Sequence, residues 1–205
     1  MKISFLTTGS AVALALLCAS CTKPAAEDEN SALDKQQSAQ ALFLGALARN
    51  CGKAFAGKLV STDKADEDMA DKAMVMHVSK CEPDEIRVPF HVGDNRSRTW
   101  VLTNTSDGLR LKHDHRHEDG SEDAVTQYGG DTASVGTKSR QEFPVDAESI
   151  ALFKKEGLDQ SVTNIWAIEV DDALFAYELR REGRFFRVEF DLTTPIETPP
   201  PAWGS

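Results

Sequence analysis

Apolar side chains recur at every second position through two successive hairpins near the end of the sequence, and this alternation constrains the fold most. A turn at Asp171-Asp172 would pair Val170, Ile168 and Trp166 with Ala173, Phe175 and Tyr177. A turn at Glu182-Gly183 would pair Leu179, Tyr177 and Phe175 with Phe186, Val188 and Phe190. Both hairpins place these residues on one surface, and a slip of one residue would turn all of them toward water. The segment is therefore predicted to be antiparallel sheet.

A third hairpin is predicted around Glu82-Pro83-Asp84. It would pair Val78, Met76 and Met74 with Val88, Phe90 and Val92. Short strands joined mainly by hairpins are typical of a mainly β (α+β) chain in which an antiparallel meander closes into a barrel or a curved half-barrel. This architecture is similar to that of lipocalins and other small ligand-holding barrels, a likeness of shape that carries no function by itself.

Two helices are expected beside the strands. An apolar stripe from Ser31 to about Phe55 predicts an N-terminal helix that ends near Gly57 and covers one opening of the barrel. A short helix should begin after Asp146, which can cap it, and end at Gly157.

The first residues have the features of an export signal. Lys2 precedes an apolar run from Ile3 to Leu17 that is too short to span a bilayer comfortably. The run ends in Cys18-Ala19-Ser20-Cys21, which resembles the lipobox of bacterial lipoproteins. This resemblance implies that Cys21 becomes the lipidated N-terminus and carries palmitate, and Thr22 after it implies an outer-membrane lipoprotein facing the periplasm.

The lipobox family usually has Leu at the position of Cys18, so ordinary secretion of a soluble periplasmic or extracellular protein is the alternative. The expected organisation is a signal peptide over 1–20, a lipidated cysteine and disordered tether over 21–30, a single β-rich domain over 31–192 and a Pro-rich tail over 193–205.

The charge of the chain bears on its partners, and its cysteine content bears on its disulfides. The chain has 23 Lys and Arg against 33 Asp and Glu, a net charge of −10, which argues against nucleic acid as a partner. We expect a monomer that contacts the membrane only through its N-terminal lipid. With Cys18 removed and Cys21 lipidated, Cys51 and Cys81 remain and are predicted to form a disulfide worth on the order of 3 kcal/mol.

The segment from Leu109 to Tyr128 concentrates the residues with chemical potential. In an extended strand, His113, His115 and His117 share a face with Leu109 and Leu111, which should point inward. A turn at Asp107-Gly108 would set Leu102 opposite His113 and Trp100 opposite His115. The returning strand would add Glu122, Thr126 and Tyr128 to the same face.

Three interpretations of this histidine face are open. It is a polar pocket for a small anionic or hydroxylated ligand, formed by His113, His115, His117, Trp100, Thr126 and Tyr128. Alternatively it is a metal site, with zinc as the candidate ion and His113, His115 and Glu122 as ligands. Alternatively it is a solvated strand end without a function. His77 and His91 alternate away from the apolar face and are expected on the solvent side.

We therefore expect a non-enzymatic envelope lipoprotein whose β domain binds a small ligand or an envelope partner, and we assign no catalytic residue. The first alternative is a metal-dependent hydrolase centred on the His113/His115/His117 strand, with Glu122 as its base. The second alternative is a purely structural envelope protein.

Overall fold

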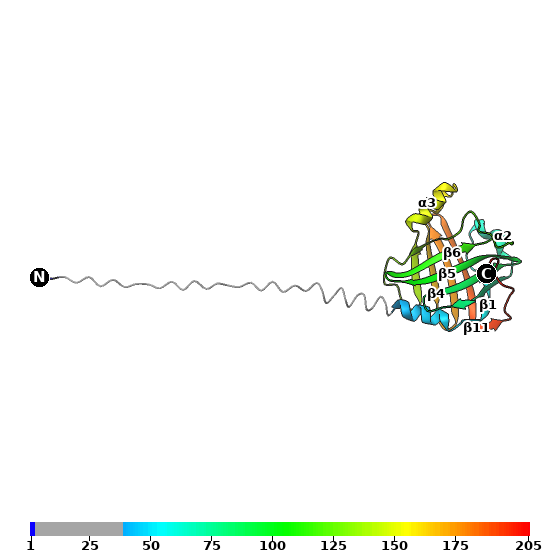
Figure 1. Cartoon of the computed structure of the whole chain (residues 1–205), viewed down its shortest axis with the longest axis horizontal. Coiled ribbons are helices and arrows are strands. Elements are labelled where there is room, and N and C mark those ends of the chain that lie inside the picture. The colour runs from blue at the N-terminus through cyan, green and yellow to red at the C-terminus, as the bar shows by residue number, and fades with distance from the viewer. Residues whose placement is uncertain (3–38) are drawn as a thin grey trace.

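The computed structural model describes residues 1–2 and 39–205. Its strands are β1 (Ala54–Leu59), β2 (Met74–His77), β3 (Lys80–Cys81), β4 (Glu85–Val92), β5 (Asn95–Thr105), β6 (Gly108–His115), β7 (Tyr128–Asp131), β8 (Arg140–Pro144), β9 (Ile165–Val170), β10 (Leu174–Arg181) and β11 (Arg184–Ile196). They form one sheet in the order β7-β6-β5-β4-β2-β1-β11-β10-β9-β8, with β3 paired to β4. The pairs are antiparallel, and the sheet curls into the nearly closed barrel expected from the sequence (Figure 1).

The barrel has one seam, between the terminal strands β7 and β8. At this seam the amide of Asp146 donates to the carbonyl of Gly129 at 3.0 Å. The Ser149 hydroxyl accepts from the Gly129 amide at 2.7 Å and donates to the Gly129 carbonyl at 3.1 Å. The backbones approach so closely that a Cβ atom at Gly130 would lie 1.7 Å from the carbonyl oxygen of Pro144. A glycine at position 130 is therefore required for closure.

The barrel interior is filled mainly by aromatic side chains. Trp100 is 2% exposed and stacks on Phe90 and Tyr177, with ring centroids 4.8 and 4.4 Å away. Phe175 and Phe190 complete the group and are fully buried. Burying such large rings supplies much of the stabilising free energy of a small barrel.

The N-terminal helix, of which residues 39–48 are described, covers one end of the barrel. Phe43 and Leu47 are fully buried in the core. Gln40 Nε2 donates to Thr132 Oγ1 after β7, and Arg49 forms an ion pair with Asp172 between β9 and β10. The prediction that this helix covers one opening of the barrel is confirmed. The helix ends earlier than expected, because Ala54 and Phe55 belong to β1.

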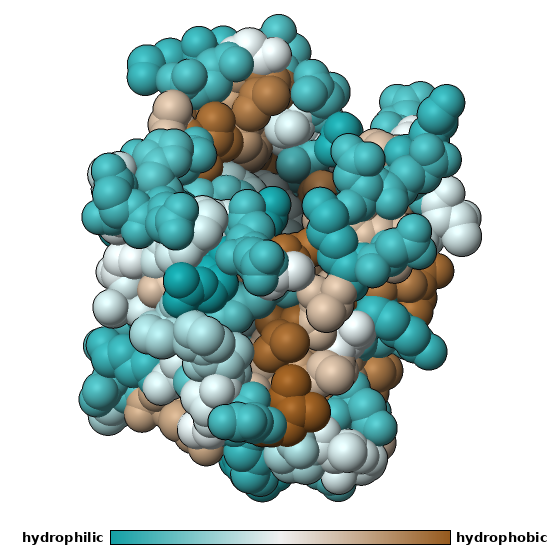
Figure 2. Space-filling model, turned by 90° about the vertical axis from the view of Figure 1, so that its right-hand side faces the viewer, coloured by the Kyte–Doolittle hydropathy of each residue, from teal (hydrophilic) through white to brown (hydrophobic). Residues whose placement is uncertain are grey.

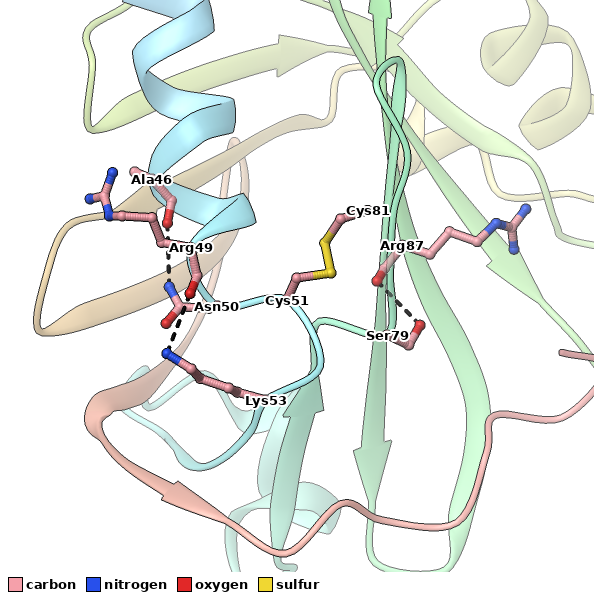
Figure 3. Close-up of a disulfide and its surroundings, with 8 residues drawn as sticks. All are labelled: Ala46, Arg49, Asn50, Cys51, Lys53, Ser79, Cys81 and Arg87. Carbon is pink, nitrogen blue, oxygen red and sulfur yellow. Dashed lines mark hydrogen bonds between the residues drawn. A yellow bond between two sulfur atoms is a disulfide. The ribbon is translucent and has the colours of Figure 1, made fainter.

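The predicted disulfide between Cys51 and Cys81 is confirmed. Cys51 lies in the turn after the N-terminal helix and Cys81 lies in β3, so the bond joins the helix to the sheet (Figure 3). The pair closes a sequence separation of 30 residues at the covered end of the barrel.

The other end of the barrel, which we call the α3 end, lies next to α3 (Ala147–Lys155) (Figure 1). Asp146 caps this helix as predicted, since its side chain accepts from the Ser149 amide. The short helices η1 (Lys64–Asp66) and α2 (Glu67–Ala70) join β1 to β2. The helix η1 is held to β11 by the ion pair of Asp66 with Arg184. A third short helix, η2 (Asp159–Ser161), lies between α3 and β9.

The predicted register is confirmed in two of the four hairpins. Met76 pairs with Phe90, Met74 with Val92, and the β10–β11 pairs agree with the predicted register. Two hairpins are shifted by two residues. Val170 faces Phe175 rather than Ala173, and Trp100 faces His113 rather than His115. A two-residue shift keeps every side chain on its predicted face, because the side-chain period of a strand is two.

The Pro-rich tail after β11 packs back against the barrel. The Arg96 guanidinium donates to the Pro201 carbonyl at 2.8 Å, and the Trp203 amide donates to the Arg96 carbonyl at 3.1 Å. Ala202 between them is 7% exposed. The end of the chain is thereby tied to β5. The predicted signal peptide and Cys21 lie outside the described residues, apart from residues 1–2.

Candidate functional site

Three neighbouring strands bring polar residues together at the α3 end. Register places Trp100 and Arg98 of β5 opposite His113 and His115 of β6, and Tyr128 of β7 opposite His113. Leu109 and Leu111 on the same face of β6 are fully buried, which confirms that this face points inward. The histidine row therefore extends the apolar interior toward the α3 end, as the sequence predicted for His113 and His115.

His113 is the innermost polar residue of the site. It is 2% exposed, and its ring stacks on Tyr128 at 4.6 Å. Its Nδ1 lies 3.0 Å from the carbonyl oxygen of Tyr128, and its Nε2 lies 2.7 Å from the Tyr177 hydroxyl. A carbonyl only accepts, so Nδ1 carries the proton and donates it, and Nε2 accepts from the Tyr177 hydroxyl. Both nitrogens of His113 are satisfied.

Burial keeps this pair uncharged. Burial, followed by the charge of the neighbouring His115, lowers the pKa of His113 to about 3. Burial also raises the pKa of the Tyr177 phenol well above its ordinary value. At neutral pH the pair is thus a neutral imidazole with a phenol that donates to it.

His115 lies closer to the surface, with Tyr128 beside it. Its backbone amide donates to Thr126 Oγ1 at 2.8 Å, and its Nε2 lies 3.3 Å from the Tyr128 hydroxyl. Burial, followed by the positive charge of Arg98, lowers the pKa of His115 to about 4, and Asp123 and Asp114 oppose this effect without offsetting it. Burial likewise raises the pKa of Tyr128 above its ordinary value.

Arg98 supplies the positive charge of the site. Its Nη1 donates to Asn95 Oδ1 at 3.0 Å, and none of the ion pairs found among residues 39–205 includes it. Burial lowers the pKa of its guanidinium, and the phenols of Tyr128 and Tyr177 lie near enough to oppose that effect. The alternation of the sequence did not indicate a role for this residue.

The outer members of this group are within reach of solvent. His115, Tyr128, Thr126 and Arg98 are half-buried, whereas His113, Tyr177 and Trp166 behind them are buried. Tyr128 also packs on Phe153 of α3 at 5.3 Å. Figure 2 shows a hollow beside α3, at the top of the molecule, with hydrophobic atoms inside it and hydrophilic atoms around it. We call the side chains of Arg98, His113, His115, Tyr128 and Tyr177 the recess cluster.

Two predicted site residues lie elsewhere. His117 is exposed in the turn after β6, where its amide donates to the Ser121 carbonyl. Glu122 is also exposed and forms an ion pair with Arg116 at 3.1 Å. Arg116 and Glu122 form an isolated bridge, so the strand ends after His115 and the alternation of faces no longer applies to the residues that follow.

The predicted zinc site at His113, His115 and Glu122 is therefore not assembled. Among the residues that the structure describes, no group of three or more His, Cys, Asp and Glu residues is placed to hold a metal ion. Both nitrogens of His113 are already hydrogen-bonded within the protein. Trp100, predicted to line the pocket, is part of the aromatic core.

The expectation that His91 faces solvent is wrong. His91 is 4% exposed and its Nε2 has no hydrogen-bond partner in the described structure. Burial, followed by the charges of Arg96 and His77, lowers its pKa to about 4. The other histidine of this strand pair, His77, is half-buried.

Other hollows lie away from the recess cluster. One of about 240 Å³ separates Leu44 and Ala48 of the N-terminal helix from Pro83 and Ile86, close to the disulfide. Another, of about 440 Å³, lies along the β10–β11 turn between Asp63 and Phe185. Neither is lined by a histidine or a tyrosine, so the recess cluster remains the candidate site.

Comparison of the chain with protein-family models, with curated proteins and with solved structures gave no match.

Proposed function

We propose that this protein is a non-enzymatic binding module of the cell envelope that holds a small ligand at the α3 end of its barrel. The proposal rests on the recess cluster, in which half-buried polar side chains lie next to buried aromatic rings. Small-ligand sites combine such an apolar lining with a few polar groups that fix the orientation of the ligand.

The protonation states favour binding over acid–base catalysis. A general base works best with a pKa near the working pH, whereas burial holds the pKa values of His113 and His115 at about 3 and 4. Neutral imidazoles and protonated phenols instead offer fixed hydrogen-bond donors and acceptors. The metal-dependent hydrolase is not carried forward, because its three ligands do not meet.

A fluorescent probe tests this proposal. N-phenyl-1-naphthylamine, an uncharged aromatic amine, should bind the purified domain and brighten as it leaves water. His115→Trp should fill the recess and abolish binding, while His117→Trp adds the same side chain in the exposed turn and should leave binding unchanged. If wild type does not bind the probe, or if His115→Trp binds it normally, the purely structural interpretation is preferred.

We further propose that the chain is an outer-membrane lipoprotein anchored through Cys21 and facing the periplasm. The support is the signal-like start of the sequence and the small residues before Cys21. Among the residues described, no helix has both the length and the apolar character needed to cross a bilayer. Metabolic labelling with palmitate should mark the wild type and not Cys21→Ser, and an unlabelled wild type would favour ordinary secretion.

A further inference from the structure

We propose that the ligand is an amphipathic anion, whose carboxylate, sulfonate or phosphate group is bound by Arg98 and whose apolar part lies against the aromatic rings of the recess. This inference rests on the proposed function and names the class of ligand that the site takes. It draws on the charge pairing of the arginines, on the hydrogen-bonding capacity of the cluster and on the apolar surface beside it.

Arg98 differs from most arginines of the barrel in its charge pairing. Arg110, Arg116, Arg140, Arg184 and Arg187 each form an ion pair with at least one carboxylate. Arg98 has Asn95 as its hydrogen-bond acceptor, and Asn95 is neutral. A guanidinium has five N–H donors, so most of those on Arg98 have no acceptor among the described protein atoms.

The surroundings of Arg98 strengthen the attraction of its charge for an anion. Burial disfavours the charged form of Arg98, yet an arginine remains protonated at neutral pH. A positive charge that is partly removed from water and has no opposite charge beside it attracts an anion more strongly than an arginine in open solvent does. The net charge of the whole chain is −10, so this local attraction is not a general property of the surface.

The rest of the cluster is suited to an anion. Tyr128 OH and His115 Nε2 are held together by a 3.3 Å hydrogen bond, longer than the 2.7 Å bond between Tyr177 and His113. Such a long bond is the weaker of the two, and the Tyr128 hydroxyl can rotate to donate its proton to an oxygen that enters the recess. Because both groups are uncharged at neutral pH, they add hydrogen bonds without adding a competing negative charge.

The aromatic rings next to these groups favour an apolar part on the ligand. The ring of Tyr128 lies 5.3 Å from that of His115 and packs on the buried rings of Trp166 at 5.8 Å and Phe153 at 5.3 Å. A ligand bound at Arg98 and His115 would lie against the half-buried ring of Tyr128, and contact with an aromatic ring favours hydrocarbon over a fully hydrated anion. A chain or ring system with one acidic head group satisfies both requirements.

Two probes that differ by one anionic group test the inference. 8-Anilinonaphthalene-1-sulfonate has the aromatic skeleton of N-phenyl-1-naphthylamine with a sulfonate added. We expect Arg98→Gln to raise the Kd of the sulfonate about tenfold or more and to change the Kd of the uncharged amine less than twofold. Arg110→Gln is the control, since it removes the same charge from an exposed arginine paired with Asp131.

The outcomes separate the inference from the proposed function. If both probes bind wild type, are blocked by His115→Trp and respond equally to Arg98→Gln, the anion is wrong and the small-ligand site stands. The anion is equally wrong if Arg110→Gln weakens binding of the sulfonate as much as Arg98→Gln does. If neither probe binds, or if His115→Trp blocks neither, both fail.

A measurement on the wild type keeps the inference testable if Arg98→Gln does not fold. Decanoate and 1-decanol share the same hydrocarbon chain and differ in the charge of the head group. Decanoate should displace N-phenyl-1-naphthylamine at a concentration at least tenfold lower than 1-decanol does. Equal displacement by the two compounds would overturn the anionic ligand.

Discussion

His113 shows how burial at the α3 end determines the protonation state of a single side chain. The residue occupies an inward position of β6, where hydrogen bonds to Tyr128 and Tyr177 satisfy both of its nitrogens. Those bonds require the neutral ring with the proton on Nδ1. Protonation would place a second proton on Nε2, next to a hydroxyl that now donates to it, in surroundings that do not solvate charge.

The free energy of unfolding should therefore decrease as the pH falls from 7 to 5. An unfolded histidine takes up a proton near pH 6.5, whereas folded His113 does so only near pH 3, so the unfolded state binds more protons in this interval. His113 alone should account for about 2 kcal/mol of the loss at pH 5. Urea unfolding at the two pH values measures it.

His113→Phe should reduce this pH dependence, since it keeps an aromatic ring and removes the titrating group. His117→Gln is the matched control, because His117 is exposed in the turn after β6. His91 and His115, with pKa values lowered to about 4, should preserve part of the slope. An equal slope in His113→Phe and wild type would contradict the role given to His113.

Among the secondary-structure elements, the faces of the strands were more predictable than their pairing. Alternation alone put Leu109, Leu111 and His113 inside, since any residue on the wrong face would expose a row of apolar side chains. Turn position was harder to predict. The β5–β6 turn pairs Thr105 with Gly108, so it begins one residue earlier than expected and shifts the pairing by two residues. As a result, Arg98 rather than Trp100 faces His115.

The elements also show where alternation stops being informative. His117 and Glu122 were assigned to the inner face because the strand was extended past His115, where the chain in fact turns. His91 is buried although the alternation of its strand turns it away from the apolar core. By contrast, the cap at Asp146 and the pairing of Cys51 with Cys81 follow from residue type and number alone, and both are confirmed.

The disulfide should stabilise the barrel without contributing to the recess. Cys51→Ser/Cys81→Ser removes the link between the N-terminal helix and β3 and should lower the free energy of unfolding by about 3 kcal/mol. Because the bond lies at the covered end, the double variant should bind N-phenyl-1-naphthylamine with unchanged affinity while folded. Urea unfolding measures the stability, and titration with the probe measures the affinity. A large loss of affinity would contradict the view that the disulfide end of the barrel does not contribute to the recess.

At the scale of the whole molecule, the barrel closes at the seam between β7 and β8, which are not paired by a regular series of backbone hydrogen bonds. Strands β7 and β8 meet through the Gly129 backbone, the Asp146 amide and the Ser149 hydroxyl. This seam lies next to Tyr128, so it also positions one wall of the recess. The backbone contact at Gly130 leaves no space for a side chain.

Gly130→Ala should destabilise the barrel by about 3 kcal/mol or more, because a new Cβ would lie 1.7 Å from the Pro144 carbonyl and force the seam apart. Gly45→Ala is the control, since a Cβ there meets no atom within 4 Å and alanine favours the helix. Thermal unfolding of both variants checks the prediction. Equal melting temperatures would show that the seam relaxes freely.

The position of the N-terminal helix has a consequence for the orientation of the molecule. The chain enters the barrel at the end closed by this helix, opposite the end that holds the recess cluster (Figure 1). In a protein held to a bilayer by its first residues, the sealed end would then be nearest the point of attachment and the α3 end farthest from it. A ligand dissolved in the aqueous compartment could then reach the recess cluster without passing between the barrel and the membrane.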